Sequence, residues 1–293
     1  MPPRLTGTLS LYPLPSSAWA RRPYFTSGDE GADRAVVFIG GLHAGLLDAP
    51  FLVPLSRTLG ASGWRLVQMH WSGAYDGFGS GSLARDCDEM EALVGHLQAE
   101  GVRLVVIAGH STGAQDVLHY LTSARRSVGG GILVSPASDR EYYEMGRDAV
   151  WTAQLEIAQR LIKDGRGDTL LDDEMTRAFG ARVTAYRLHN LIGVGGEDDY
   201  FSSDIPDTAD GVHAHPLSES FGRLSVPVRA LWMENDHCAS LPDQRVLLRR
   251  WEVASGGKLS WNLVEGATHS VEEEEAQAVL CEDVCAWLLA HFG

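Results

Sequence analysis

The chain has 293 residues, and its 24 basic and 39 acidic side chains give a formal net charge of −15. This surplus of acid argues against nucleic acid or an anionic membrane surface as a partner, because no run of basic residues offsets the repulsion from phosphate. With 44% hydrophobic residues, the chain has enough apolar material for a core, which excludes global disorder.

Membrane insertion and secretion are not expected. The sequence has no apolar stretch of about 18 residues or more, so it predicts no transmembrane helix. Polar residues and prolines interrupt the first 20 residues, which therefore lack the apolar region of a signal peptide. The four cysteines (Cys87, Cys238, Cys281 and Cys285) form no CxxC pattern, and reduced thiols are expected. The sequence therefore predicts a cytoplasmic protein.

Short apolar runs rich in Val, Ile and Leu alternate with helical patterns along much of the chain. Strands are expected at residues 8–12, 34–39, 64–70, 102–108, 131–135, 226–232 and 259–264. Helical spacing occurs at residues 50–62, 82–99, 113–123, 150–163 and 271–292. Ser82 is placed to cap one helix, and the acidic run at 272–275 suits the first turn of the last helix. The alternation predicts a mostly parallel sheet with helices on both faces.

One region breaks this alternation. From about residue 139 to 222 there is no apolar strand run, and helical patterns are followed by loops rich in Gly, Asp and Pro. We therefore expect residues 1–138 and 223–293 to form one α/β core, and residues 139–222 to form a helical lid inserted into it.

The strongest local motif is Gly109-His110-Ser111-Thr112-Gly113, which lies between an expected strand and an expected helix. This is the context of the G-x-S-x-G nucleophile elbow. A Cβ atom at either glycine would clash with neighbouring backbone, and the tight turn lifts the Ser111 hydroxyl clear of the sheet. The motif predicts Ser111 as a nucleophile and the Thr112 backbone N–H as a donor to an oxyanion.

A nucleophilic serine needs a histidine base and a carboxylate that orients it. Asp236 and His269 each follow an expected strand, in the order Ser, acid, His that this kind of fold uses. Both should therefore reach the same edge of the sheet as Ser111. Glu234, two residues before Asp236, is the alternative acid.

A second oxyanion donor is expected in the loop after the strand at 34–39. Gly40 and Gly41 allow a sharp turn that presents the Leu42 N–H, although an ordinary strand-to-helix turn would carry the same glycines. His43 follows and is a candidate pocket residue. His43, His70 and His237 match no metal-ligand spacing, so a metal site is not expected. A serine triad also needs no organic cofactor, so none is expected.

Five segments carry a family resemblance. They are residues 39–42, 77–83, 109–116 (Gly-His-Ser-Thr-Gly-Ala-Gln-Asp), 135–141 and 198–204 (Asp-Asp-Tyr-Phe-Ser-Ser-Asp). On these segments the chain resembles the α/β-hydrolases and, more narrowly, a fungal and plant family that includes siderophore esterases of the fusarinine-hydrolysing type. The resemblance implies an α/β-hydrolase fold with an inserted lid and ester hydrolysis. Two positions depart from the pattern: Ala114 stands where many relatives have Cys, and His237 stands where an acid usually follows the triad aspartate.

The predicted insertion supplies further candidates for contact with substrate. Tyr142 and Tyr200 are candidate lining residues, with plain packing of a helical layer as the alternative for each. Arg140 either contacts a polar substrate or forms a structural ion pair that holds the lid. His43 and His237 are placed at the rim. The acidic residues between 197 and 210 either form a solvated loop with helix caps or bind a cation or a cationic substrate.

The sequence as a whole favours a serine hydrolase that cleaves a small-molecule ester, which the resemblance narrows to a siderophore-type ester. In this hypothesis Ser111 attacks the carbonyl, His269 transfers the proton and Asp236 orients His269. Two alternatives stay open at this point. One is another acyl-transfer enzyme with the same triad, such as an amidase, thioesterase or acyltransferase. The other is a non-catalytic ligand-binding protein with the hydrolase fold. The sequence does not indicate an oligomeric state.

Overall fold

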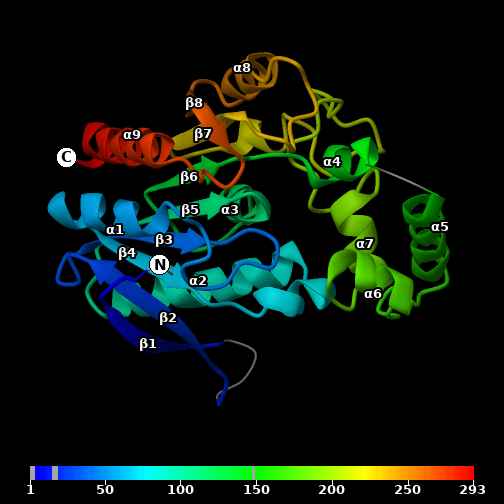
Figure 1. Cartoon of the computed structure of the whole chain (residues 1–293), viewed down its shortest axis with the longest axis horizontal. Helices are drawn as coiled ribbons and strands as arrows, with labels where there is room; N and C mark the ends of the chain where they lie inside the picture. Colours follow the sequence, from blue (N-terminus) through cyan, green and yellow to red (C-terminus); the bar gives the residue numbers. More distant parts are fainter. Residues whose placement is uncertain (1–3, 15–18, 147–148) are drawn as a thin grey trace.

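The structure is a computed structural model that describes residues 4–14, 19–146 and 149–293. Within these residues, eight strands form one sheet in the order β1-β2-β4-β3-β5-β6-β7-β8 (Figure 1). The strands are β1 (Thr8–Pro13), β2 (Arg21–Gly28), β3 (Arg34–Ile39), β4 (Arg65–Met69), β5 (Leu104–His110), β6 (Gly130–Val134), β7 (Val228–Asn235) and β8 (Leu259–Thr268). β2 pairs antiparallel with β1 and β4, and the other neighbouring strands are parallel.

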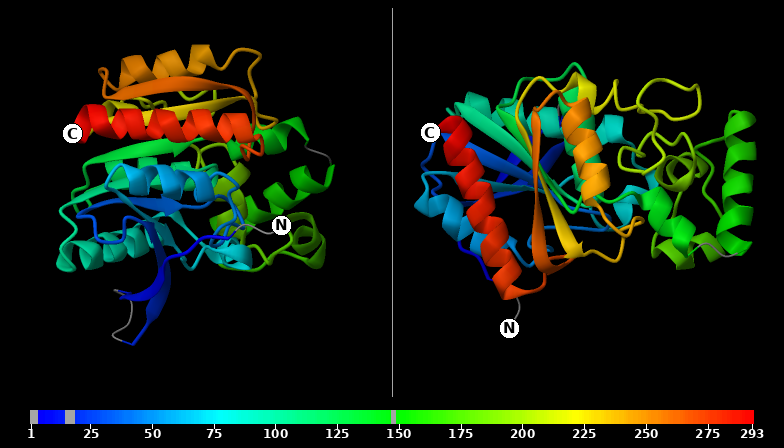
Figure 2. Two further views of the ribbon diagram at one scale, coloured as in Figure 1. Left: turned by 60° about the vertical axis from the view of Figure 1, so that its left-hand side comes forward. Right: turned by 90° about the horizontal axis from the view of Figure 1, so that it is seen from above.

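Helices cover both faces of the sheet (Figures 1 and 2). Helices α1 (Leu52–Ala61) and α9 (Glu274–Phe292) pack on one face, and α2 (Leu83–Ala99), α3 (Thr112–Thr122) and α8 (Arg245–Ala254) pack on the other. The central strand β5 serves both cores, because alternate side chains of a strand point to opposite faces. Its Val105 and Ile107 enter the core under α2 and α3, and Val106 and Ala108 enter the core under α1 and α9. This confirms the predicted mostly parallel sheet between two helical layers.

One strand and one α-helix of the described core were not predicted from the sequence. β2 has polar residues and a proline among its eight residues, and it is fixed by pairing between β1 and β4 rather than by an apolar run. α8 is short, and its buried side chains Leu247, Leu248 and Trp251 alternate with arginines. The other expected strands and helices of the core occur with ends shifted by a few residues, and the Ser82 side chain caps α2 as predicted by accepting the Arg85 N–H.

In the described residues between β6 and β7, the helices are joined by long loops. This segment contains α4 (Asp139–Met145), α5 (Ala149–Lys163), α6 (Asp173–Phe179), α7 (Ala185–Ile192) and the 3-10 turn η2 (Phe221–Arg223). Helices α4 to α7 lie together at one end of the sheet (Figure 2). Helices α5 to α7 share an apolar cluster with Phe78 from the 3-10 helix η1 (Tyr75–Ser80) of the core. None of the helices in the described part of the chain is long and apolar enough to cross a membrane.

Candidate active site

Ser111 occupies the turn between β5 and α3. Its backbone has φ 56° and ψ −124°, a conformation that a non-glycine residue rarely adopts. A Cβ atom on Gly109 would lie 2.0 Å from the carbonyl oxygen of Gly113, and one on Gly113 would lie 2.4 Å from the carbonyl oxygen of Gly40. Both glycines of the motif are therefore required by close backbone packing. This packing holds Ser111 in its turn at the end of the sheet.

The structure brings the three predicted triad residues into one hydrogen-bonded chain. His269 Nε2 lies 2.9 Å from Ser111 Oγ, and His269 Nδ1 lies 2.9 Å and 2.8 Å from the two carboxylate oxygens of Asp236. Asp236 follows β7 and is buried, with 5% of its surface exposed, and His269 follows β8 with 8% exposed. The alternative acid, Glu234, is exposed and accepts the Gly266 N–H at 2.8 Å, so it braces β8 rather than the imidazole.

The loop after β3 packs directly on the elbow. A Cβ atom on Gly41 would lie 3.0 Å from Ser111 Cβ, a tight contact, so the absence of a side chain favours this close approach of the loop. Leu42 and Thr112, the two predicted oxyanion donors, line one small cavity together with Gly41. Their donor role stays a prediction. Leu42 also lines the larger pocket that contains Ser111, and Thr112 is the next residue after Ser111.

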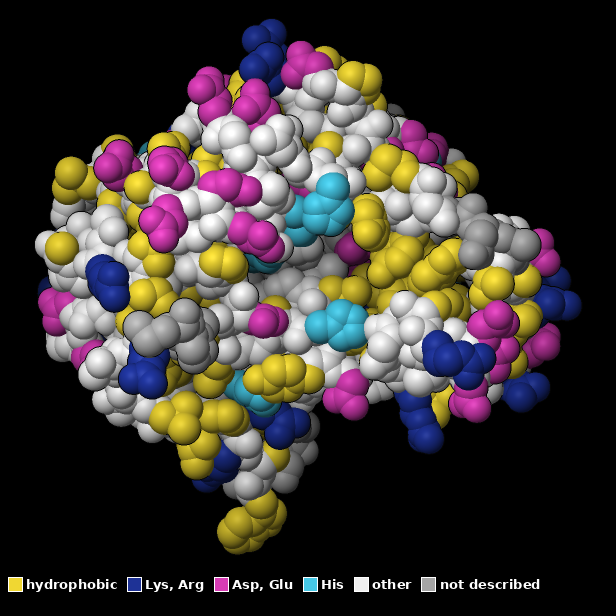
Figure 3. Space-filling model, in the orientation of Figure 1, with side chains coloured by type: hydrophobic (Ala, Val, Ile, Leu, Met, Phe, Trp, Pro, Cys, Tyr) yellow, Lys and Arg dark blue, Asp and Glu magenta, His cyan; other side chains and the backbone are white. Residues whose placement is uncertain are grey.

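A pocket of about 520 Å³ opens over Ser111 and His269. Three of the predicted substrate-contacting residues line it: His43, Tyr142 and His237. The His237 ring lies 5.8 Å from the Tyr142 ring and 5.4 Å from the His269 ring, measured between centroids. In the space-filling view, histidine side chains surround a hollow that borders a hydrophobic area (Figure 3). The pocket therefore has an aromatic and imidazole wall next to the hydroxyl of Ser111.

Arg140 and Tyr200 do not line this pocket, which corrects the expectation that they contact substrate there. Arg140 is 3% exposed and forms ion pairs with Asp199, at 2.6 Å from Nε, and with Asp204. Tyr200 is also buried, and its hydroxyl lies 2.8 Å from His119 Nδ1. The physical reason is that each polar end finds a partner inside the protein. Of the two roles open for Arg140, the structure favours the structural ion pair.

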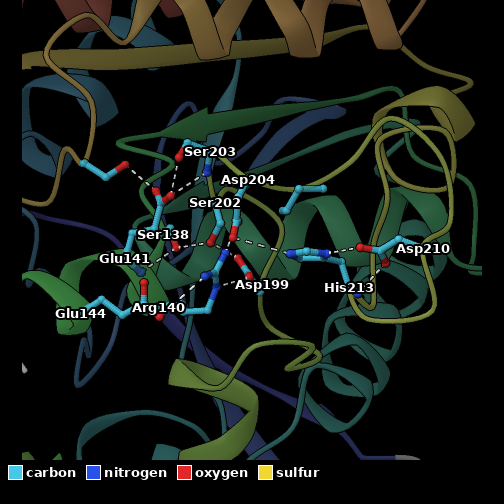
Figure 4. Close-up of polar contacts among 12 residues, drawn as sticks. Ser138, Arg140, Glu141, Glu144, Asp199, Ser202, Ser203, Asp204, Asp210 and His213 are labelled. Carbon is cyan, nitrogen blue, oxygen red and sulfur yellow. Dashed lines mark hydrogen bonds and ion pairs between the residues drawn. The ribbon is translucent and has the colours of Figure 1, made fainter.

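The contacts of Arg140 belong to a polar network that joins α4 to the segment 199–204 (Figure 4). The hydroxyl groups of Ser138 and Ser202 lie 2.6 Å apart. The Glu141 carboxylate accepts the N–H of Ser203 at 2.8 Å and the hydroxyl of the same residue at 2.5 Å. These bonds hold α4 in place. Three of its other side chains, Asp139, Tyr142 and Tyr143, line the pocket.

The acidic loop fits the expectation of a solvated loop only in part, because Glu197, Asp204, Asp207 and Asp210 are exposed but two other acids are not. Asp198 and Asp199 are not solvated, because they are buried and ion-paired with Arg187 and Arg140, respectively. The exposed Asp210 accepts the backbone N–H groups of Val212 and His213, which lower its pKa to about 2. Part of the negative charge of this loop is thus neutralised inside the protein.

Sequence reasoning missed several side chains that line the pocket, and two of them, Asp139 and Cys238, have a raised pKa. Asp139 accepts a hydrogen bond from Gln115 Nε2 at 2.7 Å, and burial raises the pKa of its carboxyl group to about 6. Cys238 also lines the pocket, and burial raises the pKa of its thiol, with a further increase from nearby Asp236. No pattern in the sequence distinguishes Asp139 from the other acidic residues near it, or Cys238 from the other three thiols.

In the described ranges, one group of neighbouring side chains could offer three ligand atoms to a metal ion: Asp236, His237 and Cys238, with these atoms within 4.8 Å of one another. However, both oxygens of the Asp236 carboxylate contact the His269 imidazole, and one of them also accepts the Cys238 N–H at 2.8 Å. We therefore assign this carboxylate to the imidazole.

The sheet order, the strained serine turn and the pocket at the end of the strands define the chain as an α/β-hydrolase. Solved structures agree with this fold. The siderophore hydrolase EstB from Aspergillus fumigatus aligns with a TM-score of 0.79 and 24% identity, over 99% of this chain and 98% of that one. A monoglyceride lipase from Saccharomyces cerevisiae aligns with a TM-score of 0.65 and 14% identity, over 99% and 98% of the two chains.

Within this class, the chain belongs to the family described as "Protein of unknown function (DUF1749)", which it matches over residues 2–289. A UPF0613 protein of Schizosaccharomyces pombe is 31% identical over 84% of this chain and 83% of its own length. The Esterase AN6793 of Emericella nidulans is 28% identical over 81% and 80% of the two chains. The Fusarinine C esterase sidJ of Aspergillus fumigatus is 24% identical over 86% of each. The chain is thus similar to siderophore esterases, as its sequence motifs indicated.

Proposed function

We propose that this protein is a serine esterase that hydrolyses a small-molecule ester with Ser111, His269 and Asp236 as its catalytic triad. The observation that carries the proposal is the continuous hydrogen-bonded chain from Asp236 through His269 to Ser111. A serine hydroxyl is a weak nucleophile unless a base takes its proton, and this chain supplies the base and the group that orients it. The esterases among the relatives support the same function.

In the acylation step, Ser111 Oγ attacks the ester carbonyl carbon while its proton moves to His269 Nε2. Asp236 accepts the Nδ1–H bond, which fixes the tautomer whose Nε2 is free to take that proton and stabilises the imidazolium that forms. The backbone N–H groups of Leu42 and Thr112 stabilise the negative oxygen of the tetrahedral intermediate. The C–O bond then breaks, and His269 returns the proton to the leaving alcohol.

Deacylation repeats these steps with water as the nucleophile. His269 takes one proton from the attacking water, and the second tetrahedral intermediate collapses to release the carboxylic acid. The proton on Nε2 then goes back to Ser111 Oγ, which restores the starting state.

Residues 139–222 are proposed to act as the lid of this site, between core segments 1–138 and 223–293. The contacts of α4 support this role, because Arg140 and Glu141 hold the helix while Tyr142 forms part of the pocket wall. Such a wall shapes the pocket and limits the access of water to the reacting groups.

A siderophore-type ester is the proposed substrate class. Two proteins to which this chain is similar carry that activity in their names, a fusarinine C esterase and a siderophore hydrolase. The pocket volume of about 520 Å³ is in the range of sites that hold drug-sized small molecules. Comparison of kcat/KM for fusarinine C with that for methyl butyrate, whose alkoxide leaving group is equally unactivated, tests this class, and a preference for the simple ester would contradict it.

The triad proposal is tested with p-nitrophenyl esters and a fluorophosphonate probe. The wild-type protein should hydrolyse the esters and be labelled at Ser111, and Ser111→Ala should do neither while keeping its thermal unfolding temperature. Ser123→Ala is the matched control, because it removes a serine hydroxyl at the end of α3 that donates to the His119 carbonyl oxygen at 2.6 Å. A ligand-binding protein would not be labelled. An acyltransferase would give mainly the transfer product when a competing alcohol is added.

A further inference from the structure

The backbone carbonyl of His269 accepts hydrogen bonds from two side chains. His110 Nε2 lies 2.9 Å from this oxygen, and Ser135 Oγ donates to it at 2.8 Å. His110 is the last residue of β5, and Ser135 directly follows β6. Both side chains are buried, and Ser135 has no exposed surface. Two neighbouring strand ends therefore converge on a single atom of the residue that reaches Ser111.

The protonation state of His110 suits it to donate this bond. Burial, and to a lesser degree the neighbouring His269, lower the pKa of its imidazole to about 4. His110 is therefore neutral at pH 7, and its Nε2 must carry the proton because it faces a carbonyl oxygen. The two imidazole rings lie 5.1 Å apart, so a neutral His110 also avoids a second positive charge beside the His269 imidazolium.

The backbone around this carbonyl is held in uncommon conformations. Ser135 has φ 50°, and Val271, two residues after His269, has φ 55° although it is β-branched. Val271 is fully buried, and its N–H donates to the Thr268 carbonyl oxygen at 2.9 Å. Such conformations persist only where surrounding contacts fix them. The loop that carries His269 is thus held from several sides.

We propose that His110 and Ser135 are positioning residues that set the place of His269 relative to Ser111, an inference that rests on the proposed esterase function. Asp236 fixes the orientation of the imidazole ring through Nδ1. However, Nε2 of this ring reaches Ser111 Oγ only if the backbone of His269 is also held in place. The two donors supply that second constraint. A displacement of about 1 Å at such a site costs up to about 10²-fold in rate, so loss of the donors should lower kcat rather than raise KM.

Four variants test this proposal. His110→Leu and Ser135→Ala each remove one donor, and a double variant removes both. His110→Gln keeps an N–H donor at a similar reach. Two controls remove matched bonds elsewhere. His291→Leu removes a ring-nitrogen bond to the Trp287 carbonyl at 2.9 Å, and Ser123→Ala removes a hydroxyl bond to the His119 carbonyl at 2.6 Å.

For p-nitrophenyl butyrate we expect His110→Leu to lower kcat at least about 10-fold with KM within about twofold, and the double variant to lower it further. His110→Gln should keep kcat within about threefold of the wild type, as should both controls. The proposal is wrong if His110→Leu keeps its kcat, or if His110→Gln loses as much as His110→Leu, because ring packing would then explain the loss.

A second measurement separates this proposal from the esterase proposal. The downfield proton resonance of His269 Nδ1–H reports its bond to Asp236 and needs no substrate. It should be unchanged in His110→Gln and shifted or broadened in His110→Leu. An unchanged resonance in His110→Leu would overturn the positioning role. A wild-type protein that shows the resonance but hydrolyses no ester would instead overturn the proposed function.

Discussion

His269 Nε2 lies 2.9 Å from Ser111 Oγ, although 158 positions separate the two residues in the sequence. The contact arises because β5, β6, β7 and β8 are neighbours in the sheet and run parallel, so that their carboxyl ends meet at one edge. Ser111 follows β5, Ser135 follows β6, Asp236 follows β7 and His269 follows β8. The ends of four adjacent strands thus all contribute to the site.

Replacement of Asp236 by Asn should abolish most of the activity. The side-chain amide of Asn has one acceptor oxygen and one NH2 donor in place of two acceptor oxygens. Since the NH2 group can donate to Nδ1, the ring proton moves to Nε2, which then no longer serves as a base. We expect Asp236→Asn to lower kcat by about 10⁴-fold while the protein stays folded. Hydrolysis of p-nitrophenyl butyrate and circular dichroism check this. Glu234→Gln is the control and should stay within about threefold of the wild type. Loss of activity in Glu234→Gln instead would reverse the assignment of the acid.

The arrangement of the triad could be predicted from the sequence because it follows from strand positions. Apolar runs locate β5, β7 and β8, and parallel pairing places the residue after each run at a common edge. The turn at Ser111 could also be predicted, because its glycines belong to one short contiguous motif. By contrast, β2 could not be predicted, because its conformation depends on pairing with β1 and β4 rather than on its own pattern.

The interior of residues 139–222 could not be predicted, because its contacts link positions far apart in the sequence. The bond between Arg140 and Asp199 spans 59 positions, and no local periodicity encodes it. For the same reason the sequence could not show that Asp139 faces the pocket while the adjacent Arg140 faces away from it.

Removal of the Arg140 side chain should destabilise the fold more than it affects substrate binding. Asp199 would be left as a buried and unpaired carboxylate, which costs about 3–5 kcal/mol when a buried ion pair loses one partner. We expect Arg140→Met to lower the unfolding temperature clearly, with KM within about twofold of the wild type for the folded fraction at low temperature. Differential scanning calorimetry and steady-state kinetics measure the two effects.

A double variant provides the control for Arg140. Arg140→Met combined with Asp199→Leu removes both charges, so it should recover part of the stability that Arg140→Met loses. A variant Arg140→Met with normal thermal stability and a strongly raised KM would contradict this view, because it would mean that the guanidinium contacts substrate after all.

The stability of the protein should depend on the ionisation of Asp139. Burial raises the pKa of this carboxyl group in the folded state from 3.8 to about 6, so the folded protein binds more protons than the unfolded chain between these values. The free energy of unfolding contributed by this group therefore falls as pH rises through this window. Asp139→Asn removes the ionisation and should keep an acceptor for Gln115, so its unfolding temperature should exceed that of the wild type at pH 7.

This advantage of Asp139→Asn should shrink towards pH 4, where the wild-type carboxyl group is protonated in the folded protein. Thermal unfolding of both proteins at pH 4, 5, 6 and 7 measures the difference directly. Asp48→Asn is the control, because Asp48 also lines the pocket but is exposed. If the unfolding temperature of Asp139→Asn exceeded that of the wild type by more at acid pH than at pH 7, this prediction would be wrong. The folded state would then favour the ionised form of the Asp139 carboxyl group.

The Cys238 thiol should be a poor nucleophile although it lines the pocket next to the triad. Burial raises its pKa, and the nearby negative charge of Asp236 raises it further, so little thiolate is present at pH 8. Since the thiolate is the reactive form, iodoacetamide should modify Cys238 more slowly than it modifies a free cysteine at this pH. Cys238→Ala should keep kcat within about threefold of the wild type. Fast alkylation that eliminates ester hydrolysis, together with an inactive Cys238→Ala, would assign the nucleophile to the thiol and exclude Ser111 from that role.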